Sequence, residues 1–111
     1  MNKELVIQNI EKEFTHGEQA RKKGNEGMVR VCARRAAGVA IAYWLESHRR
    51  DGWGIDAMNQ LRNLQFDESM PQSVREAALR LTTKITEQFT SAFHTDPIQD
   101  SKIIIDYLLQ L

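Results

Sequence analysis

The chain has 111 residues, of which 41% are hydrophobic and 27% are charged, and its formal net charge is zero. This length suits one domain, and this composition excludes a chain that is disordered throughout. No apolar run approaches the ~20 residues that a membrane-spanning helix needs, and the N-terminal residues do not read as a secretory signal. A single cysteine, Cys32, excludes an internal disulfide and a zinc site built from cysteines. We therefore expect a cytoplasmic protein without a membrane anchor.

Positive charge is concentrated in one segment. Residues 21–50 contain eight lysines and arginines and only two acids, so this basic segment carries +6 and the rest of the chain carries −6. Such a segment either faces an anion, such as RNA, a nucleotide or an acidic partner, or pairs with acidic helices of its own fold. The candidates for binding an anion or a nucleotide are Arg30, Arg34, Arg35, His48, Arg49 and Arg50.

The first predicted helix covers residues 3–23. Apolar residues, among them Ile10 and Phe14, recur along one side of it and polar residues lie opposite. Gly24 suits the left-handed position that ends a helix, and Asn25 can cap the next one. The first two helices should therefore meet at a short polar joint.

The second predicted helix, over residues 26–48, differs in kind. It has no charged residue from Ala36 to Leu45, and a helix that is apolar on all sides is buried on all sides. Gly38 costs about 1 kcal/mol against alanine inside a helix, so its presence predicts a close approach by another backbone. We expect this helix to be the centre of the fold.

Two further helices are predicted before residue 95. One covers residues 56–66, with Asp56 as its N-cap. The next begins at one of two points: Pro71 takes the first helical position, or Ser73 opens a capping box. Its apolar stripe continues to about residue 93.

The last predicted helix covers about residues 97–110 and begins at the acid–proline pair Asp96-Pro97. It contains more apolar residues than one buried side requires, which favours a homodimer. A tryptophan in the turn after the second helix is a further anchor. The interface candidates are Ile103, Tyr107, Leu109 and Trp53.

Together these segments predict an all-α fold. Helices joined by short turns form an up-and-down bundle, here of four to five antiparallel helices in a single domain over residues 1–111. No segment alternates polar and apolar residues as a strand would.

Motifs for catalysis or metal binding are incomplete. Glu13 and His16 form one E-x-x-H pair, but a di-iron bundle needs two such pairs and further inward glutamates. His48 and His94 lie near helix boundaries, and no nucleophile turn or glycine-rich phosphate loop accompanies them. We therefore assign no catalytic residue, no metal site and no cofactor. Cys32 is expected to act as a small buried hydrophobe.

A succession of helical pairs covers most of the chain. Residues 18–46 join a polar turn to an Arg-Arg-Ala-Ala helix, and residues 71–85 are followed by the acid–proline start of residues 96–109. This succession resembles HEPN-type proteins. The resemblance implies an up-and-down helical bundle, frequent homodimers, a prokaryotic setting and roles near nucleotides or RNA.

Many HEPN-type proteins are RNases with an arginine, four to six residues and then a histidine. This sequence departs from that motif, because no arginine has a histidine five to seven positions downstream. The RNase activity is therefore not transferred.

Two classes of function remain. The first is a non-catalytic dimerisation or partner-binding module whose protein partner is encoded nearby, as in a toxin–antitoxin or nucleotidyltransferase-associated pair. The alternative is an RNA- or nucleotide-binding protein, or an atypical RNase, that uses the basic segment 21–50. A protein that binds a polyanion loses affinity steeply with salt, whereas an apolar dimer does not.

Overall fold

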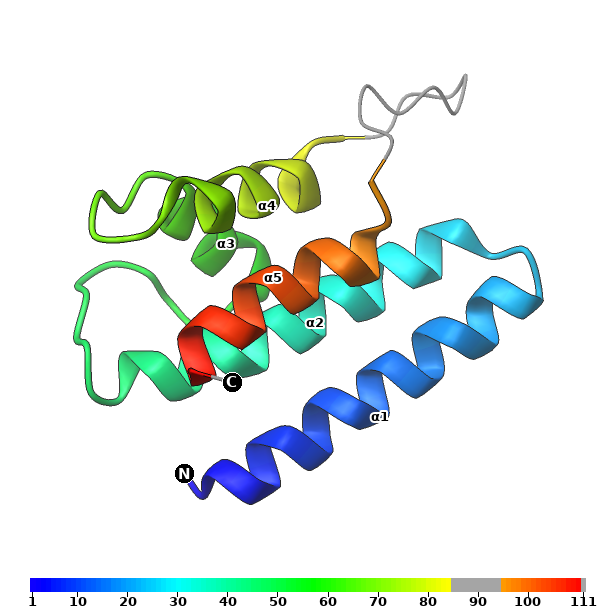
Figure 1. The fold of residues 1–111 in the computed structure, drawn as a ribbon, viewed down its shortest axis with the longest axis horizontal. Coiled ribbons are helices and arrows are strands. Elements are labelled where there is room, and N and C mark those ends of the chain that lie inside the picture. Colours follow the sequence, from blue (N-terminus) through cyan, green and yellow to red (C-terminus); the bar gives the residue numbers. More distant parts are fainter. Residues whose placement is uncertain (85–94, 111) are drawn as a thin grey trace.

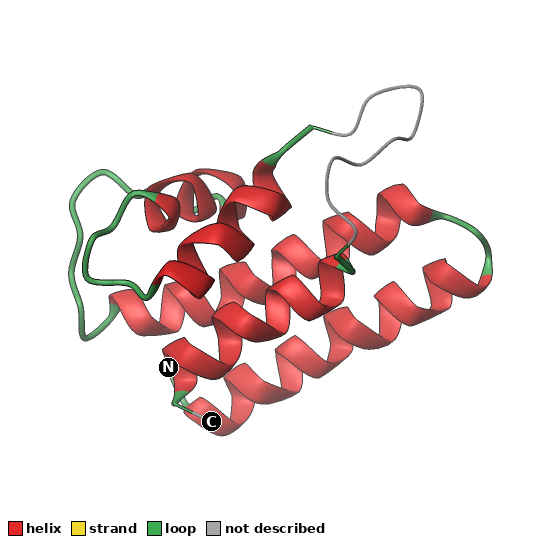
Figure 2. Cartoon of the chain, turned by 45° about the horizontal axis from the view of Figure 1, so that its top comes forward, coloured by secondary structure: helices red, strands yellow, loops and turns green. Residues whose placement is uncertain are grey.

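The structure is a computed structural model that describes residues 1–84 and 95–110, and these residues form five helices and no strand (Figures 1 and 2). The all-α prediction is therefore confirmed. The helices are α1 (Lys3–Lys22), α2 (Glu26–Leu45), α3 (Ala57–Gln65), α4 (Gln72–Thr82) and α5 (Pro97–Leu109).

The helices form a bundle around α2, which packs against each of the other four. The longer helices α1, α2, α4 and α5 alternate in direction, and the short α3 packs against both α2 and α4 (Figure 1). The start of α1 and the end of α5 lie at the same end of the bundle, where the Lys3 ammonium donates a 3.0 Å hydrogen bond to the Leu109 carbonyl (Figure 2). The prediction of a central second helix is confirmed.

Small side chains allow the close packing around α2. Ala33, Ala36 and Ala37 are fully buried, and Ser101 of α5 donates a 2.8 Å hydrogen bond to the Ala33 carbonyl. A Cβ atom added to Gly38 would lie only 2.8 Å from the Cβ of Ala57 in α3. The predicted close approach at this glycine is therefore confirmed, and Cys32 is buried as expected.

The predicted caps are present at three helix starts. Asn25 accepts a 3.1 Å hydrogen bond from the Met28 amide, and Asp56 and Asp96 accept corresponding bonds at the starts of α3 and α5. The start of α4 follows neither alternative, because Pro71 occupies the N-cap position without a side-chain cap and Ser73 lies inside the helix. Gly24, at φ +72°, has the left-handed conformation that separates α1 from α2.

Two helices end before their predicted limits. α2 ends at Leu45 rather than at residue 48, and its last turn tightens, because the amides of Glu46 and Ser47 donate to carbonyls three residues earlier. In α4, Thr83 adopts an extended conformation after Thr82. The later part of the predicted fourth helix, which includes Ile85, Phe89 and Ala92, lies outside the described residues, as does His94.

Candidate binding surfaces

Arg30 and Arg34 of the basic segment turn inward onto the C-terminal end of α4. Arg30 donates from Nη2 to the Arg80 and Thr83 carbonyl oxygens at 2.8 and 3.0 Å, and Arg34 donates from Nε to the Leu81 oxygen at 2.7 Å. The last carbonyls of a helix lack intrahelical donors and form the negative end of its dipole. The side chains of these two arginines therefore cap the C-terminal end of α4.

This position explains the electrostatics of the two guanidinium groups. Burial lowers the pKa of both, and the charge of Arg34 lowers the pKa of Arg30 further. Internal pairing was one of the two expectations for these residues, but the partners are backbone carbonyls rather than side chains of acidic helices. Two of the six anion-binding candidates are thus engaged inside the bundle.

Arg21, another cation of the basic segment, is also paired inside the chain. It binds both carboxylate oxygens of Asp96, at 2.6 and 3.1 Å, and so ties the end of α1 to the start of α5. Burial raises the pKa of Asp96, but the hydrogen bonds from Arg21 and from the Ile98 amide outweigh it and hold that pKa below its ordinary value. The pair therefore has a structural role.

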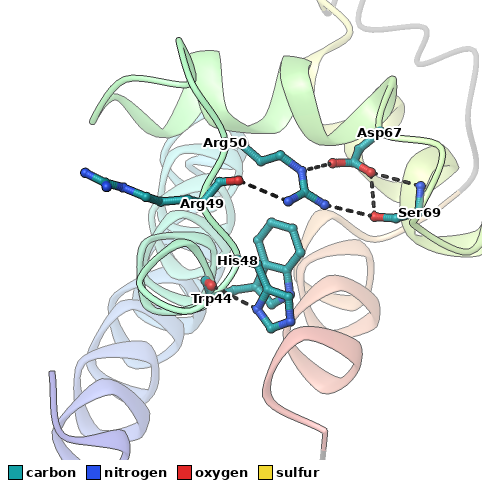
Figure 3. A network of polar contacts seen from close by, with 6 residues as sticks. All are labelled: Trp44, His48, Arg49, Arg50, Asp67 and Ser69. Atoms are coloured by element: carbon teal, nitrogen blue, oxygen red, sulfur yellow. Dashed lines mark hydrogen bonds and ion pairs between the residues drawn. The ribbon is translucent and has the colours of Figure 1, made fainter.

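Two further candidates, His48 and Arg50, come together after the end of α2 (Figure 3). The His48 ring stacks on the Trp44 ring, with centroids 4.7 Å apart and planes 3° from parallel. The Arg50 guanidinium lies 5.1 Å from the Trp44 ring centre and donates from Nε to Asp67 at 2.9 Å. Figure 3 shows the Arg49 side chain pointing away from this stack.

These residues border a groove of about 690 Å³ that ends at the last turn of α5. Burial raises the pKa of Asp67, but hydrogen bonds from Ser69 and Arg50 lower it to a net value below normal, so the carboxylate neutralises Arg50. Asp106 places a further carboxylate on the wall. The groove therefore has no excess positive charge for a polyanion. Its lining residues are Trp44, His48, Arg50, Ser69, Met70, Asp106, Tyr107, Leu108 and Gln110.

The six anion-binding candidates therefore do not form one site. Arg30 and Arg34 cap α4, and His48 and Arg50 flank Trp44 at the other end of α2. The side chains of Arg35 and Arg49 are exposed, the first within α2 and the second in the loop after it.

The four interface candidates separate into two groups. Ile103 and Tyr107 are exposed on α5, at 38% and 43% of their surface. Leu109 is only 2% exposed and Trp53 only 7%, because both pack into the core of the chain itself. Trp53 lies against Trp44, with ring centroids 5.9 Å apart. Only Ile103 and Tyr107 are therefore free to contact a second chain.

Ile103 and Tyr107 belong to a continuous exposed side of the last helix. We name this side the α5 face; it consists of Gln99, Lys102, Ile103, Asp106, Tyr107 and Gln110. Lys102 and Asp106 were missed as site residues at the sequence level, although their spacing from Gln99 and Ile103 places all four on one side of a helix. The Lys102 ammonium lies 5.6 Å from the centre of the Phe14 ring, at the edge of the face toward α1.

Other exposed apolar side chains lie elsewhere on the molecule. Ile55 is 98% exposed and borders a depression between α1 and α3 that also exposes Val39 and Ala42. Phe66 and Leu79 border a separate depression between α3 and α4. Neither pair of helices was predicted to carry a contact surface.

Among the described residues, no group of three or more histidine, cysteine, aspartate or glutamate side chains is arranged to hold a metal ion. Nor does any helix of residues 1–84 or 95–110 combine the length and the apolarity needed to cross a membrane. No family model, curated protein or solved structure matches the chain, so the resemblance to HEPN-type proteins stays a prediction.

Proposed function

We propose that this chain is a non-catalytic, HEPN-like helical module that works by binding another protein surface through the α5 face. The observation that supports it is the exposure of Ile103 and Tyr107, two large apolar side chains one helical turn apart, on a helix whose other apolar residues are buried. Exposed aromatic and aliphatic side chains at this spacing are the usual anchors of a helix-mediated contact.

The internal use of the basic segment supports this function over RNA or nucleotide binding. Arg21, Arg30, Arg34 and Arg50 all have partners within the chain. Binding a polyanion through these residues would break the cap of α4 or the ion pairs that join α5 and the α3–α4 turn to the bundle. The structural cost would oppose the electrostatic gain.

The cellular setting is part of the same proposal. A lone buried Cys32, whose thiol pKa is raised by burial and by the charge of Glu13, suits a reducing cytoplasm. A prokaryotic gene pair, of the toxin–antitoxin or nucleotidyltransferase-associated kind, would supply a protein partner in that compartment.

Photo-crosslinking in the native cells tests the proposed function. A photoreactive side chain in place of Ile103 should capture a protein, because this position lies within the contact. The matched control carries the same group in place of Ile55, which is more exposed but lies away from α5. Equal capture at both positions, or no adduct specific to position 103, would contradict the proposal.

The RNA-binding alternative has its own test. Fluorescence anisotropy with a single-stranded RNA should show no binding that falls steeply between 50 and 200 mM salt. Incubation with structured RNA should give no cleavage that disappears in His48→Ala. Either positive result would favour the basic segment as the functional site.

A further inference from the structure

We infer that the partner that the α5 face fits is a second copy of the same chain, bound antiparallel about a twofold axis that passes between residues 104 and 105. This inference rests on the proposed function, because it names the partner of that same face. It is carried by the order of apolar and charged residues along the exposed side of α5.

A twofold axis pairs each residue of the α5 face with a different residue of the second copy. In an antiparallel helix pair, the same edges of the two faces meet, and positions that are equally far from the axis lie opposite each other. Ile103 then lies beside Asp106 and Tyr107 of the second copy, and Gln99 lies opposite its Gln110. The apolar edge of one face therefore meets the apolar edge of the other.

The charged edge is complementary in the same arrangement. Lys102 and Asp106 are four residues apart along one edge of the α5 face, so antiparallel pairing brings the ammonium of each chain near the carboxylate of the other. A parallel pairing about a twofold axis would instead bring the charged edge of each copy against the apolar edge of the other. Charged groups that lose water without gaining an ionic partner are destabilising, so the charges select the antiparallel direction.

The dimensions of the face set the strength of the contact. A helix of 13 residues, such as α5, is about 20 Å long at 1.5 Å per residue. A single helix pair of this length belongs to the small end of the range of protein interfaces. We therefore expect a reversible dimer with a dissociation constant on the order of micromolar.

Charge reversal tests the pairing directly. Lys102→Glu and Asp106→Lys should each raise the dissociation constant of the homodimer about tenfold, because two symmetric ion pairs become two repulsive contacts. A mixture of the two variants should form a heterodimer as tight as the wild-type dimer. The double variant with both changes in one chain should also recover homodimerisation. The control is Lys12→Glu, a charge reversal at an exposed position of α1.

Analytical ultracentrifugation measures all of these variants, and circular dichroism checks that each remains helical. A wild-type chain that is monomeric up to 100 micromolar would overturn the inference, and a crosslink from position 103 to a different protein would then still support the proposed function. A dimer that Ile103→Asp disrupts but that neither charge reversal weakens would also overturn the antiparallel arrangement. The antiparallel arrangement would also be overturned if either single variant lost the dimer and the mixture of the two variants did not recover it.

Discussion

The two apolar-rich helices, α2 and α5, differ in how completely the bundle covers them. From Ala36 to Leu45, α2 has no charged residue, it packs against the other four helices, and every side chain of this stretch is buried or half-buried. α5 packs against α2 and α4 and leaves one side to solvent, where Ile103 and Tyr107 project. High apolar content therefore indicates burial in one helix and an available surface in the other, and the position of the helix in the bundle decides between them.

The size of the side chains follows this difference. In α2, alanines and Gly38 keep the backbones of neighbouring helices close, whereas the isoleucines and leucines of α5 fill the space at the edge of the core. A central helix needs small residues because several neighbours must approach it at once. An edge helix can use large residues because only part of its circumference is covered.

The largest effect is expected from a charge placed in α2. Ala37→Glu puts an unpaired carboxylate at a fully buried position, so the variant should fail to fold. Circular dichroism should show loss of helical signal at 25 °C. A variant that melted at the wild-type temperature would show that α2 is not the centre of the bundle.

Truncation on the two sides of α5 should separate its buried residues from its exposed ones. Leu109→Ala should lower the free energy of unfolding by about 2–4 kcal/mol, because it removes a buried side chain. Tyr107→Ala should change the stability of the monomer by less than about 0.5 kcal/mol. Urea titrations of the dilute chain measure both, and equal losses would mean that Tyr107 is part of the core.

Adding a methyl group at Gly38 should also destabilise the bundle. The added methyl group of Gly38→Ala would lie 2.8 Å from the Ala57 Cβ, so α3 must move away from α2. We expect a loss of about 1–3 kcal/mol, as for other overpacked sites. Thermal melts of Gly38→Ala and of Gly38→Ala with Ala57→Gly should show a loss and then a partial recovery. A melting temperature above that of the wild type would contradict the close contact.

Removing one of the arginine caps of α4 should have a smaller effect. Arg34→Gln loses the 2.7 Å hydrogen bond to the Leu81 carbonyl, but Arg30 still donates to that oxygen at 3.3 Å. The expected loss is about 1 kcal/mol. The matched control is Arg35→Gln, an exposed arginine on the same helix, whose effect on the urea midpoint should be close to zero.

The smallest effect concerns the acid response of the ion pair between Arg21 and Asp96. The pKa of Asp96 lies below its ordinary value of 3.8 when the chain is folded, so the pair stabilises the fold above pH 3.8 and this contribution is lost as the pH falls toward the folded pKa. The contribution should be less than about 1 kcal/mol, because both groups are partly exposed. Asp96→Asn should therefore lower stability at pH 7 and flatten the loss of stability below pH 4. An unchanged acid titration of unfolding would show that the pair contributes nothing.

Residues adjacent in the sequence were enough to predict where most helices begin. Asn25, Asp56 and Asp96 each cap the helix that the sequence predicts for them, because a cap depends on the few residues around it. Helix ends were harder to predict. The side chains of Thr82 and Thr83 bond back to carbonyls of α4, and Arg30 and Arg34 reach the same end from α2, some fifty residues earlier in the sequence.

The candidate binding residues were also predicted only in part, because their exposure depends on contacts between distant segments. Charge counting identified the basic segment, but it could not show that the arginines at its centre point into the bundle, because the direction of a side chain depends on which helices lie beside it. Apolar counting identified a surplus on the last helix, but it grouped the buried Leu109 with the exposed Ile103 and Tyr107.

The sequence by itself determined the all-α fold, the central position of α2 and the close contact at Gly38. Hydrophobic periodicity, a stretch without charge and the unfavourable helix propensity of glycine can each be read from consecutive residues. Only the tertiary structure decided which cations are used internally and which side of α5 remains exposed. Both outcomes depend on the neighbours that a helix acquires when distant segments pack together. The carbonyls at the end of α4 take up Arg30 and Arg34, and the absence of a helix over Ile103 and Tyr107, among the residues described, leaves the α5 face open.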